Sequence, residues 1–286
     1  MKNILSLVVL TAILFTSCDK IDDPVLDFNI QYRSDLYGEA PTFGAASTTT
    51  KNVFLEDFTG HNCGFCPDAA VIADEIFAQY PDRVSLMAIH AGSLAEPDPG
   101  DSQFFADWTS DDGDVLWDQL DFQFNPAGRI NRVGGPGVFL SPTTWVDETL
   151  AEINQTAVVN LQIQANFGVE GNHANVHVNG QFASAYENPT NITVYITESD
   201  LFGYQLWYDN DPEYVPNYEF KHVLRGSITG PLGLSFTDEA PAANEEVQID
   251  YSYEWNNAWV AENCYVVAVI TDNVTGEVLN VIEAHL

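Results

Sequence analysis

The sequence predicts two folded domains of different class, an α/β domain followed by an antiparallel β-sandwich. Residues 51–156 combine strand-length apolar runs with a segment whose apolar residues recur at helical spacing, whereas from residue 157 onward apolar and polar residues alternate. The length of 286 residues also exceeds one ordinary domain, and 45% apolar content is enough for two cores. We therefore expect an α/β domain at 51–156 and a β-sandwich at 157–286.

Residues 1–17 have the features of a bacterial lipoprotein signal. Lys2 precedes a mostly apolar run at 4–15, and the small residues Thr16 and Ser17 lead into Cys18. The run is too short to span a bilayer as a stable helix. Small residues before a cysteine resemble a lipobox, which implies that Cys18 is lipidated and anchors the chain to the outer membrane; a plain cleaved signal is the alternative. The acidic residues directly after Cys18 resemble surface-export signals of Bacteroidota lipoproteins, which implies exposure at the cell surface.

Residues 18–50 predict a tether, because Pro, Gly and Ser/Thr occur there without a sustained period. The formal net charge of −33 argues against binding to nucleic-acid phosphates. The glycine-rich stretch at 134–137 lacks the Lys and the helix start of a phosphate-binding loop. We expect neither a nucleic-acid partner nor a cofactor.

The α/β domain is organised around a pair of cysteines. Residues 53–58 predict a strand, a break follows at Thr59-Gly60, and Cys63 and Cys66 come directly before a helix that Pro67 suits as first-turn residue. A helix N-terminus stabilises an anion, so a thiolate forms there more readily than in solution. A strand, a C-x-x-C pair and a helix in this order are typical of a thioredoxin-like domain.

Two other uses of the cysteine pair stay open. Zinc would need further ligands, for which only His61 and His90 are near, and no second pair exists. An inert disulfide is the other alternative in an oxidising compartment. His61 could stabilise a thiolate as an imidazolium or be an exposed loop residue, and His90 ends the predicted strand at 83–90.

Asp57 lies in the predicted central strand, six residues before Cys63, on the face opposite Glu56. Burial should raise the pKa of Asp57 and suit it to accept a proton from the second thiol; a solvent-reaching acid is the alternative. Pro126 precedes a further strand, where thioredoxin-like folds place a cis-proline. We expect a cis bond there, with Asn125 facing an extended peptide substrate, although an ordinary trans proline would also fit.

Two further segments complete the α/β domain. Apolar residues in the acidic stretch 91–124 predict two short helices on either side of a break at 111–114. The acidic residues there do not follow the spacing of a calcium-binding loop, so no metal site is expected. Ser141 and Pro142 predict the start of a helix that continues to about Gln155.

The second domain shows regular alternation. The alternating segments are residues 159–165, 174–178, 192–196, 247–253 and 265–270. Residues 204–225, rich in Tyr, Trp and Asp, interrupt the pattern and could form a binding loop. Cys264 has no evident partner and is expected to be a buried free thiol.

Together these motifs resemble the outer membrane protein 28-related lipoproteins of Bacteroidota over most of residues 51–286. The strand before Cys63, the C-x-x-C-P motif, the stretch from Pro126 to Arg132 and the residues at 198–201, 205 and 222–225 carry the resemblance. This family is thought to join a thioredoxin-like domain to a β-sandwich. Gly64 also matches thioredoxin and Phe65 is similar to the aromatic residue of periplasmic disulfide isomerases, which implies that both contact substrate.

Two functions follow. In the first, Cys63 is the attacking thiolate, Cys66 the resolving thiol, Asp57 the proton relay and Pro126 part of the peptide platform of a thiol-disulfide oxidoreductase. Its partners would be extracytoplasmic protein thiols or disulfides. In the alternative, the chain is a non-catalytic surface binding or adhesion lipoprotein with a structural disulfide.

Overall fold

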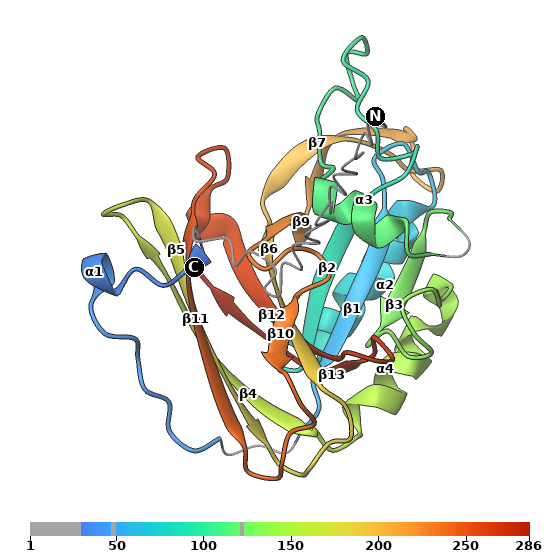
Figure 1. Ribbon diagram of the computed structural model, residues 1–286. Coiled ribbons are helices and arrows are strands. Elements are labelled where there is room, and N and C mark those ends of the chain that lie inside the picture. The colour runs from blue at the N-terminus through green and yellow to red at the C-terminus, as the bar shows by residue number, and fades with distance from the viewer. Residues whose placement is uncertain (1–29, 47–49, 121–122) are drawn as a thin grey trace, which may run out of the picture.

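The computed structural model describes residues 30–46, 50–120 and 123–286, which form a mixed α/β structure with most strands in one large sheet (Figure 1). The helices are α1 (Ser34–Tyr37), α2 (Cys66–Gln79), α3 (Asp111–Trp117) and α4 (Trp145–Ile153). The strands are β1 (Val53–Thr59), β2 (Val84–His90), β3 (Ala127–Ile130), β4 (Val159–Gly168), β5 (His173–Phe182), β6 (Thr190–Glu198), β7 (Leu201–Leu206), β8 (Tyr214–Phe220), β9 (Val223–Ser227), β10 (Leu234–Thr237), β11 (Glu246–Glu254), β12 (Cys264–Asp272) and β13 (Val278–His285).

The large sheet contains strands from both ends of the chain. Its order is β13-β12-β6-β9-β2-β1-β3, with β10 beside β6. β1 and β2 are parallel, β3 runs antiparallel to β1, and β9 lies beside β2 with Ala88 opposite Val223. The large sheet therefore contains strands from both sides of the boundary expected between residues 156 and 157.

Alternation along β1 divides the core of this part of the sheet. Val53 and Leu55 pack with α2 and α4, where Ala73 and Trp145 are buried. Phe54 and Phe58 belong to a second cluster with Leu116 of α3 and Val267 of β12. Apolar residues occupy both faces of β1, as expected for a strand in the middle of a sheet.

A three-stranded antiparallel sheet, β11-β5-β4, forms a separate layer. Its Val176 and Val178 share a core with Val194 and Ile196 of β6 and with Val266 of β12. The five alternating segments of the sequence all lie in strands, namely β4, β5, β6, β11 and β12. The period-two pattern identified these strands correctly.

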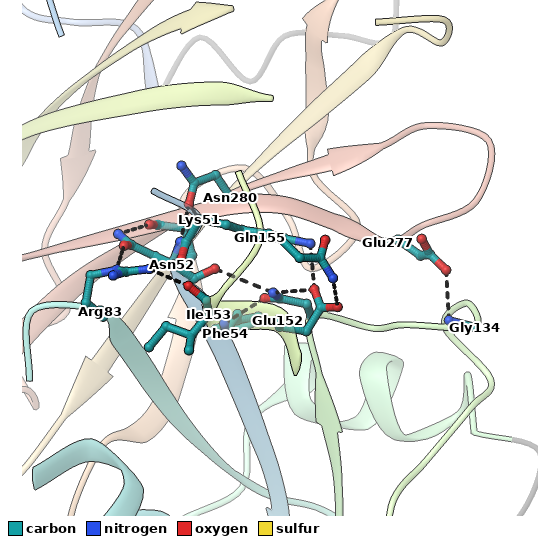
Figure 2. A network of polar contacts seen from close by, with 12 residues as sticks. Lys51, Asn52, Phe54, Arg83, Gly134, Glu152, Ile153, Gln155, Glu277 and Asn280 are labelled. Atoms are coloured by element: carbon teal, nitrogen blue, oxygen red, sulfur yellow. Dashed lines mark hydrogen bonds and ion pairs between the residues drawn. The ribbon is translucent and has the colours of Figure 1, made fainter. Parts of the chain in front are cut away.

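Polar contacts join the start of β1 to α4 and β13 (Figure 2). The Asn52 amide N–H donates to Asn280 Oδ1 at 2.9 Å, and Lys51 Nζ lies 2.6 Å from Glu152 Oε2. Arg83 donates to the carbonyl of Lys51 at 2.6 Å. Early and late parts of the chain are thus held together by hydrogen bonds as well as by the shared sheet.

The acidic stretch before residue 124 differs from expectation. One helix, α3, runs through the position where a break was predicted, and residues 101–108 are irregular. Ser110 caps the helix, because its side chain accepts from the Gly113 N–H, and three aspartates in the first turn favour the same start. These local effects outweigh the glycine within the helix.

The leader and Cys18 lie outside the described residues, so lipidation stays a prediction. Within the part of the chain that the structure describes, no helix is long and apolar enough to cross a membrane.

Candidate functional site

Cys63 and Cys66 form a disulfide between the end of β1 and the start of α2. Cys66 is the first residue of the helix and Pro67 follows it, as the sequence predicted. Only 3% of the surface of Cys63 and 2% of that of Cys66 are exposed. A thiol from another protein therefore meets very little sulfur surface in this conformation.

The hairpin of β7 and β8 covers this bridge. The N–H of Leu206 donates to the carbonyl of His61 and the N–H of Tyr208 to that of Gly64, each at 2.9 Å. The Gln205 side chain donates to the carbonyl of Cys63 at 3.1 Å. Residues 204–225, predicted as a possible binding loop, thus supply a strand segment that is hydrogen-bonded along the C-x-x-C loop.

Gly64 and Phe65, the expected substrate contacts, both meet this hairpin. A Cβ atom on Gly64 would lie 2.5 Å from the ring of Tyr208, so only glycine permits the approach. Phe65 packs edge-on against the same ring, with the centroids 5.0 Å apart, and remains 59% exposed. The Tyr208 ring therefore occupies the space over Gly64.

The peptide bond between Asn125 and Pro126 is cis, as predicted. The side-chain amide of Asn125 donates to the carbonyls of Thr59 at 2.7 Å and Ala91 at 3.1 Å. This amide therefore ties together the chain just after β2 and the end of β1. Its oxygen is buried without a hydrogen-bond partner among the described residues.

Asp57 lies behind the bridge in a small cavity of about 50 Å3, together with Cys66, His90 and Tyr218. Burial, reinforced by the charge of Asp74, raises the pKa of Asp57 to about 8, in the predicted direction. Its Oδ1 atom has no hydrogen-bond partner in the described structure. The cavity is large enough for water, which could carry a proton between the carboxyl group and a neighbouring group.

Both nearby histidines are buried: His90 ends β2 as predicted, whereas His61 is not the exposed loop residue that was one of its two alternatives. Burial lowers the pKa of His90 to about 3, and His61 and Arg225 add to this effect. Burial also lowers the pKa of His61, whose Nε2 lies 3.1 Å from the carbonyl oxygen of Glu96. Neutral His61 does not supply the positive charge that would stabilise a Cys63 thiolate.

A zinc site at the cysteine pair would need further ligands such as these two histidines. The two sulfurs are bonded to each other. Among the described residues, no three His, Cys, Asp or Glu side chains lie close enough together to hold a metal ion.

A buried charged cluster next to this site was not assigned from the sequence. Glu56 contacts Arg129 at 2.7 Å and Arg132 at 2.8 Å, and the Arg132 guanidinium donates to Tyr195 Oη at 2.9 Å. Arg132 ends the stretch from Pro126 that contributed to the family resemblance. The alternation along β1 places Glu56 and Asp57 on opposite faces, but which residues face Glu56 depends on long-range pairing.

The fold and this site define a mixed α/β protein with a covered C-x-x-C disulfide and a cis-proline directly before β3. Residues 114–286 match the family model of outer membrane protein Omp28, and the chain belongs to this family. The family predicted from the sequence and the outer-membrane localisation are thereby confirmed. A comparison with curated proteins gives no match.

Solved structures to which this chain is similar include the following three. HBP35 of Porphyromonas gingivalis has 16% identity and a TM-score of 0.63, covering 85% of this chain and 77% of its own. It shows a shared fold. A protein of Agrobacterium tumefaciens has 11% identity and a TM-score of 0.48, covering 84% of this chain and 95% of its own. A domain of the outer membrane lipoprotein Omp28 of Porphyromonas gingivalis has 22% identity and a TM-score of 0.30, covering 46% of this chain and 88% of its own.

Proposed function

We propose that the chain is a non-catalytic binding lipoprotein, anchored through Cys18 and exposed at the cell surface. In this proposal a thioredoxin-like part, residues 51–156, holds Cys63–Cys66 as a structural disulfide. A β-sandwich, residues 157–286, presents the binding surface.

The observation that carries the proposal is the hairpin over the bridge. Three hydrogen bonds, from Leu206, Tyr208 and Gln205, fix β7 and the residues after it against the C-x-x-C loop. Trp207 adds a fourth, from Nε1 to Asp68 Oδ1 at 2.8 Å, which reaches the first turn of α2. Disulfide exchange requires a thiolate to approach one sulfur directly, so a bridge covered in this way favours a structural role.

A thiol-disulfide oxidoreductase is the second candidate, and Asp57 favours it. A buried carboxyl group with a pKa of about 8 beside the cavity that Cys66 lines has the properties of a proton acceptor for a resolving thiol. Its partners would be extracytoplasmic protein thiols or disulfides. The two candidates differ in the redox behaviour of one bond.

The deciding measurement is the reduction potential of Cys63–Cys66 in glutathione buffers, with Cys63→Ser as the control for thiol exchange. A structural bridge should have a potential below about −300 mV and show no exchange with glutathione. A potential between about −120 and −270 mV with fast exchange would overturn the proposal in favour of the oxidoreductase.

A hairpin variant tests the protection itself. Tyr208→Ala uncovers Gly64 and should speed reduction of the bridge, by about tenfold if the covered state is favoured by about 1.4 kcal/mol. Phe202→Ala is the matched control, because Phe202 is a 52% exposed aromatic residue of the same hairpin. Equal rates in the two variants would show that the hairpin does not protect the sulfurs.

A further inference from the structure

A second cavity, of about 510 Å3, lies between the segment that leads into α3, strand β9 and the residues after β11. It shares no lining residue with the cavity behind the disulfide. Its volume falls within the range of small-molecule sites in proteins, about 300–1,000 Å3. The cavity is therefore large enough for a small-molecule ligand and is separate from the cysteines.

Gly226 of β9 contributes only backbone to the lining, close to Trp259 and Asp112. A Cβ atom on this residue would lie 3.4 Å from the ring of Trp259 and 3.8 Å from Asp112 Oδ2. The Trp259 ring is nearly parallel to that of Tyr253, at 7°, with the centroids 6.4 Å apart. An aromatic ring and a carboxyl group thus both lie close to Gly226 in the lining of the cavity.

Arg225 adds a hydrogen-bond donor that the protein does not use. Its guanidinium carbon lies 5.9 Å from the centroid of the Trp259 ring, and its Nε lies 3.2 Å from Glu198 Oε2. The buried Nη1 has no hydrogen-bond partner in the part of the chain that is described. Arg225 lines the cavity with 15% of its side chain exposed, so the exposed part of the guanidinium can donate to an acceptor on a ligand.

The charges around the cavity restrict the ligand. Asp107, Asp111 and Asp112 line it and disfavour an anion, whereas a simple cation would leave the Arg225 donor unpartnered. Hydroxyl groups both donate and accept, so they satisfy the carboxylates and the guanidinium together. The Trp259 ring in turn suits the apolar C–H face of another ring.

We propose that this cavity binds a neutral saccharide, with Trp259 contacting the face of a pyranose ring and Asp112 and Arg225 bonding its hydroxyl groups. The inference rests on the proposed binding function and names its ligand class.

The test is a titration of the mature chain with the methyl pyranosides of glucose, galactose, mannose and N-acetylglucosamine, followed by saturation-transfer NMR and calorimetry. At least one should bind in the millimolar range, about −4 kcal/mol. Trp259→Ala should weaken that binding by about tenfold or more, as expected for loss of a central aromatic contact. Phe105→Ala, at a 61% exposed aromatic residue that does not line the cavity, should leave it unchanged.

Because Trp259 also packs against Trp255, a second variant guards against a folding defect. Gly226→Ala adds one methyl group at ordinary contact distances, so the fold should persist while binding falls severalfold. Thermal unfolding of each variant verifies the fold.

Absence of binding by all four pyranosides would overturn the inference, as would unchanged binding in both cavity variants. Binding of glycine or butylamine in their place, lost in Gly226→Ala, would overturn the saccharide class. A catalytic reduction potential of Cys63–Cys66 would overturn the proposed function without altering these titrations, so the two failures are distinguishable.

Discussion

Glu56 and Asp57 are neighbours on β1, both buried, yet their environments differ completely. Burial alone would raise the pKa of Glu56, but the guanidinium groups of Arg129 and Arg132 outweigh it and hold the pKa below the usual value. On the other face, burial and the charge of Asp74 raise the pKa of Asp57 to about 8. The contrast shows that partners, rather than burial, decide whether a buried acid carries charge.

The two faces accordingly have different roles. Around Glu56, both carboxylate oxygens accept hydrogen bonds from guanidinium groups, and Tyr195 joins β6 to the same cluster. Arg129 Nε is the guanidinium nitrogen of this cluster that lacks a partner among the described residues. Around Asp57, hydrogen-bonding atoms of the acid and of His90 have no partner among the described residues. One face is a stabilising network, and the other keeps groups whose protonation can change.

Removing the ion pairs of Glu56 with Arg129 and Arg132 should have the largest effect on stability. Glu56→Gln leaves two buried guanidinium groups without a counter-charge and should lower the free energy of unfolding by about 3–5 kcal/mol. Urea unfolding at neutral pH measures this. A loss below about 1 kcal/mol would mean that the cluster does not stabilise the fold.

Removing the ionisable group of Asp57, on the other face of β1, should increase the stability of the protein. Asp57 holds its proton in the folded state up to about pH 8 but loses it near pH 3.8 when unfolded, so the wild-type protein loses stability as pH rises through this window. Asp57→Asn should therefore be more stable than the wild type by about 3 kcal/mol at pH 6, because the amide is also unpartnered but never ionises. Unfolding curves from pH 4 to 9 should show that the difference in the free energy of unfolding between Asp57→Asn and the wild type widens as pH rises. A difference that stays constant across this pH range would contradict the raised pKa of Asp57.

His90 lines the same cavity but should affect the acid side. Its pKa is about 3 in the folded protein and 6.5 in the unfolded chain, so the unfolded chain binds more protons between these values and stability falls as pH drops through them. His90→Phe should remove this loss, worth about 2 kcal/mol at pH 5. The same pH series tests this prediction. If the wild type and His90→Phe lose stability equally as pH falls, the pKa of His90 is not lowered by folding.

The smallest expected effect comes from removing one hydroxyl group from the cluster around Glu56. Tyr195→Phe removes the hydroxyl group that accepts from Arg132 and donates to the carbonyl of Pro231 at 2.8 Å. A loss of about 1 kcal/mol is expected, since the charged pair itself remains. A loss as large as that of Glu56→Gln would mean that the hydroxyl group, rather than the carboxylate, holds the cluster together.

Sequence reasoning succeeded where the signal is local. The strand before Cys63, the helix beginning at Cys66, the cis-proline at 126 and the alternating strands all follow from nearby residue types and periodicity. The raised pKa of Asp57 also followed, because an acid within an apolar strand has few ways to reach water.

The remainder depends on pairing between distant residues. Nothing local to β2 indicates that β9 lies beside it, or that residues 205–208 cover the C-x-x-C loop. Arg132 was identified within a motif, but its contact with Glu56 depends on the positive-φ turn at Asn131 and Arg132 after β3. Patterns reveal which face is buried and not which distant segment buries it.

The sheet order has a consequence for biogenesis. A chain is made from its N-terminus, so β1 and β2 exist long before β9, which lies beside β2 in the sheet. Until residues 223–227 arrive, β2 presents an open strand edge that another chain could pair with. Assembly of this sheet must therefore wait for almost the whole polypeptide, and a nascent chain interrupted before β9 is the form most exposed to aggregation and to capture by periplasmic chaperones and proteases.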